Sequence, residues 1–280
     1  MCFGLALSGG AAHAGLNDGL VAYYPFSGSG ADSSGGGNDA TTVAATLGAD
    51  RSGHPNQAYA FDGTTSFIEV SPAPKLNVLS QDWSISAWIK TGGASQLQFV
   101  VSRYGCGYEC ANLAYRAANY DLYVTGTGAA AFSVRDNIGS TFGVESTSIV
   151  ADSSWHYVTG VLDRGAKSLS MYVDGQLKGA TPFNSLGAID FDPNVPLEMG
   201  RLFVQTFPSS GNHFQGSIDE VRVYNRALGQ AEISQLMTAV PETSTLTMFL
   251  AGAAMLALRE QLPAALRRQR RVGATQRPIR

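Results

Sequence analysis

The feature that most restricts the fold of this chain is an alternation of apolar and polar residues with a period of two. It runs from Leu20 to Tyr224 and is interrupted only at turn residues. Successive side chains of a β-strand point to opposite faces, so the alternation is typical of strands with one buried face. The clearest example is Trp83-Ser84-Ile85-Ser86-Ala87-Trp88-Ile89-Lys90. We expect Ile85 and Ile89 to be buried and Ser84 and Ser86 to be exposed.

Turn residues divide the region into about a dozen short strands, and no strand–helix alternation indicates a parallel sheet. Asp174-Gly175 is typical of a type I′ hairpin turn. One short helix is expected at 229–237. The pattern therefore predicts an all-β fold, a two-sheet antiparallel sandwich or jelly roll. Besides 83–90 and alternating residues near Tyr157 and at 169–173, strands are expected at 21–26, 58–61, 66–70, 98–102, 120–125, 197–201 and 214–223.

Composition excludes several classes of protein. Only 15% of the 280 residues are charged and 32 are Gly, which favours short strands and tight turns over long helices. The net charge is −3, but residues 259–280 hold seven Arg and one Glu, so the tail is +6 and the rest is −9. An acidic body without a basic stripe does not bind nucleic acid well. It does suit divalent cations and neutral glycans.

The first 14 residues are predicted to be the remnant of a signal peptide. They are small and apolar and end in Ala12-His13-Ala14, a pattern that signal peptidase cleaves. A disordered N-terminus rich in Gly and Ala is the alternative.

The C-terminal residues 240–280 have three parts: Val240-Pro241-Glu242, an apolar run from Leu246 to Leu258, and an Arg-rich tail. The run of 13 residues makes about 20 Å of helix, short for a ~30 Å hydrocarbon core. The layout resembles the PEP-CTERM sorting signal, although Thr243 replaces the second Pro of the motif. The resemblance implies export, transient membrane association through this helix, and removal by an exosortase-type enzyme. A plain membrane anchor is the alternative.

Seven segments between residues 19 and 237 resemble, in order, the LamG-like jelly-roll domains of exported bacterial proteins, which have the concanavalin A-like/laminin-G fold. The resemblance implies one such domain at 15–239, located at the cell surface or in the extracellular matrix of a Gram-negative-type bacterium. Trp83 and Trp155 are expected in its core. The segments are Gly19–Phe26, Asp32–Gly35, Ala60–Gly63, Trp83–Lys90, Trp155–Val158, Ser170–Gly175 and Gly216–Leu228.

The resemblance to a sorting signal favours a non-catalytic recognition module that binds polysaccharide or a cell-surface protein, because proteins with such a signal are typically exported alongside exopolysaccharide. No catalytic residue is predicted, because the Glu-x-Asp-x-x-Glu motif of the glucanases on this fold is absent, and Glu69, Glu109, Glu145 and Glu198 each lack a neighbouring partner. A glycoside hydrolase and a structural matrix protein without a small ligand are the alternatives. The aromatic residues expected to bind a ligand are Trp88, Tyr104, Tyr108 and Tyr115.

A structural calcium site is a further hypothesis. The Gly-rich loop 32–39 offers oxygen ligands, which calcium prefers, and the family often joins such a loop to the Asp of the last strand. The ligands would be Asp32, Asn38, Asp39 and Asp219. The alternative is that Asp32 and Asn38 form Asx turns and Asp219 caps a bend.

Cys106 and Cys110 are the two Cys that remain after removal of the signal, and they lie in one short loop. Outside the cytoplasm such a pair is expected to form a disulfide, since a tight turn can bring the Cα atoms close enough. A two-thiol metal site is the alternative, but no His lies nearby.

Overall fold

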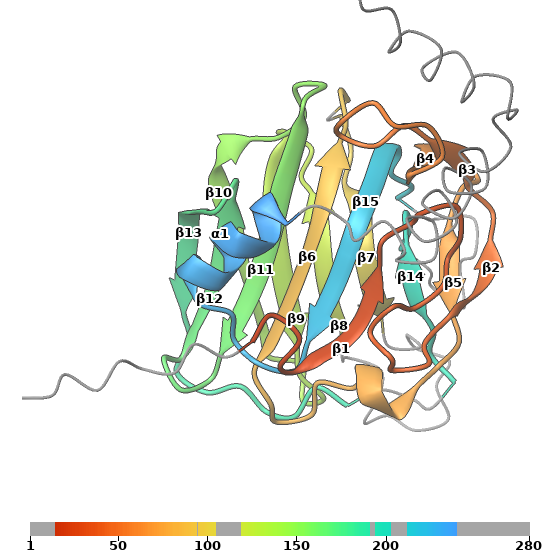
Figure 1. The fold of residues 1–280 in the computed structure, drawn as a ribbon. Helices are drawn as coiled ribbons and strands as arrows, with labels where there is room; N and C mark the ends of the chain where they lie inside the picture. Colours follow the sequence, from red (N-terminus) through yellow and green to blue (C-terminus); the bar gives the residue numbers. More distant parts are fainter. Residues whose placement is uncertain (1–14, 94, 105–118, 191–193, 203–211, 240–280) are drawn as a thin grey trace, which may run out of the picture. The chain divides into compact units, whose positions relative to one another are not determined.

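The structure is a computed structural model of the chain, and it describes residues 15–93, 95–104, 119–190, 194–202 and 212–239 (Figure 1). The chain divides into two units, residues 1–239 and 240–280, and the second lies outside the described residues. The described elements are β1 (Leu20–Tyr24), β2 (Ala40–Val43), β3 (Thr46–Gly48), β4 (Ala58–Asp62), β5 (Ile68–Val70), the 3-10 helix η1 (Pro74–Leu76), β6 (Trp83–Lys90), β7 (Gln98–Tyr104), β8 (Asn119–Val124), β9 (Ala129–Arg135), β10 (Thr141–Ile149), β11 (Trp155–Asp163), β12 (Ser168–Val173), β13 (Gln176–Pro182), β14 (Leu197–Met199), β15 (Gln215–Tyr224) and α1 (Gln230–Thr238).

The strands form two antiparallel sheets that pack face to face, as Figure 1 shows. The eight-stranded sheet has the order β13-β12-β11-β6-β15-β4-β3, and β1 also pairs with β15. The seven-stranded sheet has the order β10-β9-β8-β7-β14-β5-β2. The prediction of an all-β antiparallel sandwich of the concanavalin A-like type is confirmed.

Strand β15 changes partner halfway along its length. Its first half pairs with β4, where Ile218 lies opposite Tyr59, and its second half pairs with β1, where Val221 lies opposite Tyr24. The change coincides with a β-bulge at Glu220, whose φ is +53°. The first and last strands are therefore neighbours, as the sequence analysis expects.

The main core lies between the sheets and follows the predicted alternation. Ile85 and Ile89 are fully buried, together with Trp83. At Gly160 on β11, the ring of Phe132 from the opposite sheet comes so close that a Cβ would lie 2.3 Å from its Cγ. Glycine is required there because the two sheets approach each other more closely than any side chain allows.

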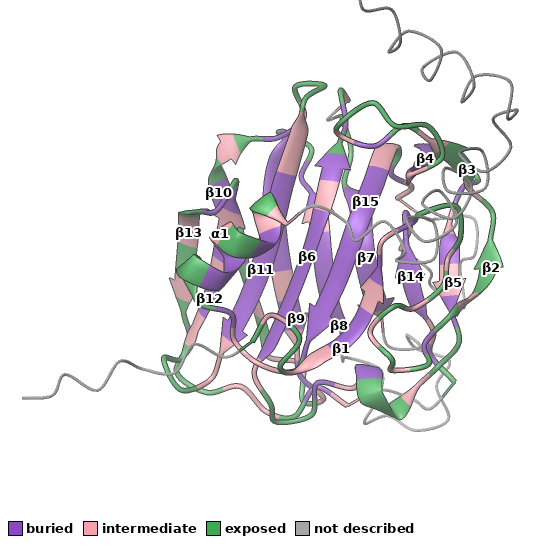
Figure 2. Ribbon diagram, viewed as in Figure 1, coloured by how far each residue is buried: buried purple, intermediate pink, exposed green. Residues whose placement is uncertain are grey.

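The expectation that Ser84 and Ser86 are exposed is wrong, because both are fully buried. Figure 2 shows that the central strands of the eight-stranded sheet are buried along most of their length. The Ser84 hydroxyl donates to the carbonyl of Arg226 at 2.8 Å and accepts from the amide of Leu228 at 3.0 Å. Period-two alternation identifies the two faces of a strand, but it does not show that a second layer covers the outer face.

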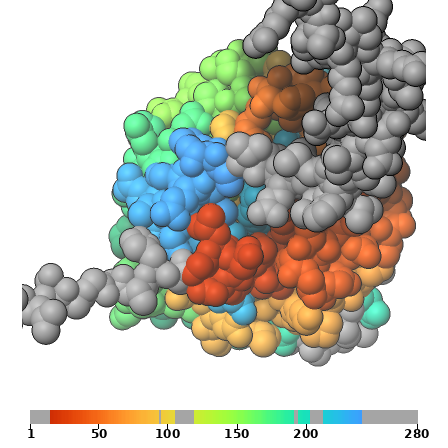
Figure 3. All heavy atoms as spheres, viewed as in Figure 1, coloured from red at the N-terminus to blue at the C-terminus, as the bar shows by residue number. Residues whose placement is uncertain are grey.

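That second layer is formed by α1 together with Leu16 and Leu20. Ile233 and Leu236 of α1 pack against Tyr157, Val161 and Tyr224 on the outer face of the eight-stranded sheet. Figure 3 shows α1, in blue, beside the first described residues, in red. The expectation of one short helix near 229–237 is confirmed, and so is the turn at Asp174-Gly175, where both residues have positive φ.

Candidate functional site

The loop that was predicted to hold calcium is organised by its own backbone amides. Asp32 Oδ1 accepts from the amides of Tyr23 and Ser34, and its Oδ2 accepts from the amide of Asn38. Asp39 Oδ1 accepts from the amide of Asp32 at 2.7 Å. Burial opposes ionisation of Asp32, but these hydrogen bonds prevail and lower its pKa. Asp32 thus forms the Asx turn that the alternative interpretation describes, whereas the Asn38 side chain bonds the carbonyl of Val21.

The fourth predicted ligand, Asp219, has a separate set of partners. Its Oδ1 accepts from the amide of Glu220, and its Oδ2 lies 3.8 Å from Nη1 of Arg51. Within the described ranges, no group of three or more His, Cys, Asp or Glu residues is placed to hold a metal ion. The described structure therefore does not gather the predicted acidic ligands into one group, and the calcium site stays a prediction.

A calcium titration of melting temperature tests that site. If Asp32 and Asp219 share an ion, a hundredfold excess over Kd adds about 2.7 kcal/mol of stability and raises the melting temperature by several degrees. The Asp219→Ala variant would then show no response to calcium. Equal melting curves of the wild-type protein with calcium and with EDTA would leave only the Asx-turn interpretation.

The predicted aromatic ligand residues are partly described. Trp88 is half-buried on the outer face of the eight-stranded sheet, where it packs against Tyr157, and the guanidinium of Arg51 lies 4.8 Å from the centre of its ring. One side of that ring is therefore covered. Tyr104 is half-buried at the end of β7. Their role in ligand binding remains a prediction.

Other predicted features lie outside the described residues. They are Tyr108, Tyr115, the pair Cys106 and Cys110, the segment 1–14 and the segment 240–280. No helix in the described part of the chain is long and apolar enough to cross a membrane.

The outer face of the eight-stranded sheet contains a buried group of charges, the Arg222 cluster, made of Tyr23, Asp219, Glu220 and Arg222. Nη2 of Arg222 lies 2.5 Å from Oε2 of Glu220, and the Tyr23 hydroxyl donates to the same oxygen at 3.3 Å. Burial raises the pKa of Asp219 to about 8, and the negative charge of Glu220 adds to the rise. The distance of 3.8 Å to Arg51 is too long for a hydrogen bond, so that cation does not cancel the effect.

The outer face of the seven-stranded sheet carries a second polar group, the carboxylate row. Strand register places its members side by side across β5, β14, β7, β8, β9 and β10. The row consists of Glu69, Glu198, Ser102, Asp121, Ser133 and Gly143. Three carboxyl groups and three small residues thus lie along one line across the sheet, with the two Glu residues side by side.

Arg201 joins the two Glu residues of the row. Its Nε and Nη2 each bond a carboxylate oxygen of Glu198, at 2.9 and 3.0 Å, and Nη2 lies 3.5 Å from Glu69. Burial raises the pKa of Glu198 to about 7; Arg201 opposes the rise, and the neighbouring Glu69 adds to it. Arg201 also lies over the ring of Phe67, with 3.3 Å between guanidinium carbon and ring centre.

Asp121 lies at the middle of the row and is buried. It accepts from the Ser102 hydroxyl at 2.6 Å and from the amide group of Asn119. Burial nevertheless raises the pKa of Asp121 to about 7. Beside it on β8, the half-buried ring of Tyr123 stacks on Phe99 with a centroid distance of 5.4 Å. The face therefore combines hydrogen-bonding groups with an aromatic ring that is accessible in part.

The sequence motifs do not predict this row, because its acidic residues lie far apart along the chain. Glu69 and Glu198 are 129 positions apart, yet they lie directly opposite each other on β5 and β14. The statement that each lacks a neighbouring partner is therefore wrong in three dimensions. The sequence feature that points to the row is an acidic residue between two apolar residues of a strand, as in Ile68-Glu69-Val70 and Leu197-Glu198-Met199.

Comparisons with known proteins agree with this architecture. In solved structures, the chain is similar to the binding domain of Paraclostridial Mosquitocidal Protein 1, with a TM-score of 0.62 and 18% identity over 80% of this chain and 52% of that one. It is also similar to the botulinum neurotoxin serotype C1 binding domain, with a TM-score of 0.58 and 12% identity over 80% and 52%. The chain spans about half the length of these two toxin domains.

A third similar structure is domain 4 of AbnA, a GH43 extracellular arabinanase from Geobacillus stearothermophilus, in complex with arabinotriose. Its TM-score is 0.56, with 17% identity over 78% of this chain and 98% of that domain. At these identities the likeness is one of fold. A search of curated proteins gives no match. The Laminin_G_3 family model matches residues 62–234. The chain therefore belongs to the concanavalin A-like lectin/glucanases superfamily, as a domain of the Laminin_G_3 type.

Proposed function

We propose that the protein is a non-catalytic recognition module that binds glycan through the outer face of the seven-stranded sheet. The observation that carries the proposal is the carboxylate row with the ring of Tyr123 beside it. The arabinotriose bound to the arabinanase domain of the same fold supports this choice of ligand.

The chemistry of the row suits sugar hydroxyl groups, which both donate and accept hydrogen bonds. A carboxylate accepts from a hydroxyl, a protonated carboxyl donates to one, and a serine does both. Glu69 and Ser133 are the half-buried members of the row that face a ligand. Asp121 and Glu198 are buried, so they act through these neighbours. An aromatic ring adds an apolar surface on which the face of a sugar ring packs.

The fixed position of Glu198 argues against hydrolysis. Glycoside hydrolases separate their two carboxyl groups by roughly 5–9.5 Å, with one free to protonate the leaving group. Here Arg201 binds both oxygens of Glu198 and also approaches Glu69. These contacts hold the two carboxylates together, so neither is free to protonate a leaving group.

A glycoside hydrolase is nevertheless the second candidate function. It is favoured by the cross-strand pairing of Glu69 with Glu198 and by the pKa of Glu198, which lies where a general acid works at neutral pH. The release of reducing ends from a panel of polysaccharides distinguishes the two. Release that Glu198→Gln abolishes would establish the hydrolase and overturn the non-catalytic proposal.

The setting of this function is proposed from the sequence alone. Residues 1–14 and 240–280 support export, processing by an exosortase-type enzyme and a final position at the cell surface or in the extracellular polysaccharide layer. Mass spectrometry of secreted protein is the test. Peptides from residues 259–280 in mature material would contradict removal of the tail.

Binding to neutral oligosaccharides, measured by calorimetry with arabino-oligosaccharides as the first probe, tests the proposed site. We expect Tyr123→Ala to weaken binding at least tenfold, about 1.4 kcal/mol, because the variant removes the accessible ring. Tyr172→Ala is the matched control, since Tyr172 is also half-buried but lies on the other sheet. Equal weakening in both variants, or in neither, would contradict this location.

A further inference from the structure

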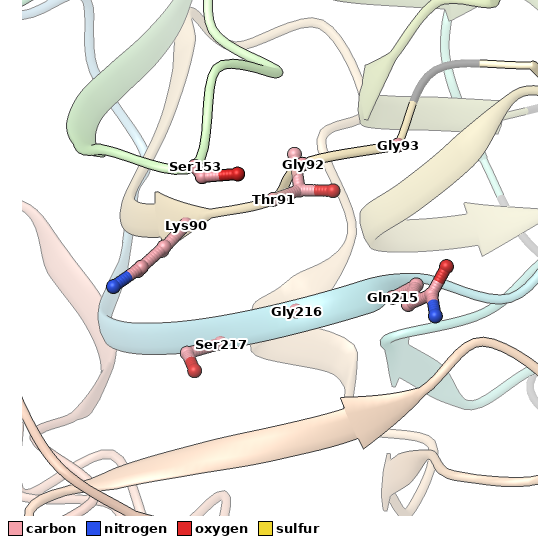
Figure 4. Close-up of a pocket in the computed structure, with 8 residues that line it drawn as sticks. All are labelled: Lys90, Thr91, Gly92, Gly93, Ser153, Gln215, Gly216 and Ser217. Carbon is pink, nitrogen blue, oxygen red and sulfur yellow. The ribbon is translucent and has the colours of Figure 1, made fainter.

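A pocket of about 410 Å³ lies beside the ends of β6 and β15, on the sheet opposite the carboxylate row. Figure 4 shows Lys90 and Ser217 extending from neighbouring strands, with Ser153 beside Gly92 and Gln215 farther along β15. Small residues make up most of the wall. The pocket is lined by Lys90, Thr91, Gly92, Gly93, Ser153, Gln215, Gly216 and Ser217.

Close packing requires glycine at two positions of the pocket wall. At Gly216, where φ is +144°, an added Cβ would lie 2.0 Å from the carbonyl oxygen of Lys90. At Gly92, an added Cβ would lie 2.4 Å from the hydroxyl of Ser153. Ser153 itself has a φ of +70°, an uncommon conformation for a residue other than glycine, and its amide donates to the carbonyl of Thr91 at 2.9 Å. Strained non-glycine residues of this kind concentrate at functional sites.

Lys90 gives the pocket its charge. The residue is exposed, and within the described part of the chain its ammonium group makes no ion pair or hydrogen bond. No carboxylate is among the described residues that line the pocket. The nearest acidic residue in sequence to Ser153 is Asp152, whose carboxylate bonds the amide of Ser154 and the ring of His156. An unpaired ammonium next to hydroxyl and amide groups favours an anionic, hydroxylated ligand.

Trp155 stands next to Lys90 on the same face of the sheet. Register places Trp155 directly opposite Lys90, and Lys90 directly opposite Ser217, on β11, β6 and β15. Side chains in directly opposite positions lie about 5 Å apart at Cβ. The expectation that Trp155 belongs to the core is wrong, because the residue is only half-buried and lies in neither hydrophobic core. The β6–β11 pairing ends here, beyond the part of the face that α1 covers.

We propose that this pocket binds an acidic sugar residue, with Lys90 facing its carboxylate or sulfate group and the ring of Trp155 packing against its pyranose face. Ser153, Gln215 and Ser217 supply hydrogen bonds to its hydroxyls. The proposal goes beyond the proposed function, because the pocket lies on the other sheet and binds independently of the carboxylate row. An aromatic ring and a cation side by side recognise a ligand that has one apolar face and one charged group.

The test uses the full-length protein and three oligosaccharides of equal length: an oligogalacturonate, a sulfated oligosaccharide and a neutral one. Calorimetry at low and high salt measures Kd for each. We expect Lys90→Gln to weaken binding of an acidic oligosaccharide at least tenfold and to abolish most of its salt dependence, because the variant removes the only proposed charge contact. Whether the carboxylated or the sulfated oligosaccharide responds identifies the anionic group.

Matched variants make the outcome decisive. Lys178→Gln removes a half-buried lysine on β13, which bonds only Gln176 in the described structure, and should leave binding unchanged. Trp155→Ala should weaken binding several-fold, with circular dichroism to confirm that the variant is folded. Tyr123→Ala should leave acidic binding intact, so loss of the neutral site and loss of this site are distinguishable. Wild-type affinity in Lys90→Gln, or equal losses in both lysine variants, would overturn the proposal.

Discussion

The free energy of unfolding is expected to fall by about 3–5 kcal/mol between pH 5 and pH 8, with a maximum near pH 4–5. The cause is three buried carboxyl groups, Asp121, Glu198 and Asp219, whose pKa values burial raises to about 7, about 7 and about 8. In the unfolded chain each of them ionises near pH 4. Between these limits the folded protein holds protons that the unfolded chain has released.

The sign follows from that difference in bound protons. Each group contributes fully below its unfolded pKa, and its contribution is lost as the pH rises toward the folded pKa, at up to about 1.4 kcal/mol per pH unit. Three such slopes, taken over the range from pH 5 to each folded pKa, would add up to more than about 3–5 kcal/mol. The expected loss is smaller, because water penetration and relaxation reduce the cost of burying charge. Asp32 and Asp50 have lowered pKa values, so their contribution is lost only at more acid pH.

Urea unfolding at pH 5, 6, 7 and 8 measures this effect, and the melting temperature should fall by roughly 10 °C over the same range. The triple variant Asp121→Asn, Glu198→Gln and Asp219→Asn is the control. It should show a much flatter profile, with a remainder from His156, whose pKa is lowered by burial but raised more strongly by Asp174 and Asp152. Constant or rising stability of the wild-type protein from pH 5 to pH 8 would contradict the burial of neutral carboxyls.

Replacing Arg222 with Met is expected to lower the free energy of unfolding by about 3–5 kcal/mol. Arg222 is the cation of the Arg222 cluster: it lies 2.5 Å from Glu220, which is fully buried, and over the ring of Tyr23 at 4.0 Å. Met fills a similar volume but leaves the Glu220 charge without a partner inside the protein. The Tyr23 hydroxyl alone, at 3.3 Å, is a weak replacement.

A double-mutant cycle separates loss of the ion pair from loss of packing. Glu220→Gln with Arg222→Met removes both charges, and we expect this double variant to recover most of the stability lost by Arg222→Met. Chemical denaturation of the four proteins gives the coupling energy. If the double variant is as unstable as the sum of the single variants, the pair contributes through packing and the cluster is not electrostatically coupled.

The sequence by itself determined the class of fold. Alternation in 83–90, the hairpin turn at Asp174-Gly175 and the helix near 229–237 depend on local chemistry: which face of a strand is apolar, which residues accept positive φ, and which apolar residues share a helix face. The order of the LamG-like segments predicted the family in the same way. Such features repeat within a few residues, so reading along the chain is enough to find them.

Only the tertiary structure decided which polar groups meet. Glu69 faces Glu198 because β5 pairs with β14, and Lys90 lies between Trp155 and Ser217 because β6 pairs with both β11 and β15. Strand order decides these contacts, and no local pattern in the sequence records it. The exposure of a side chain also depends on distant parts of the chain. Ser84 is buried because α1 covers the outer face of the sheet. Trp155, a large aromatic residue that was expected in the core, is only half-buried because it lies where that cover ends.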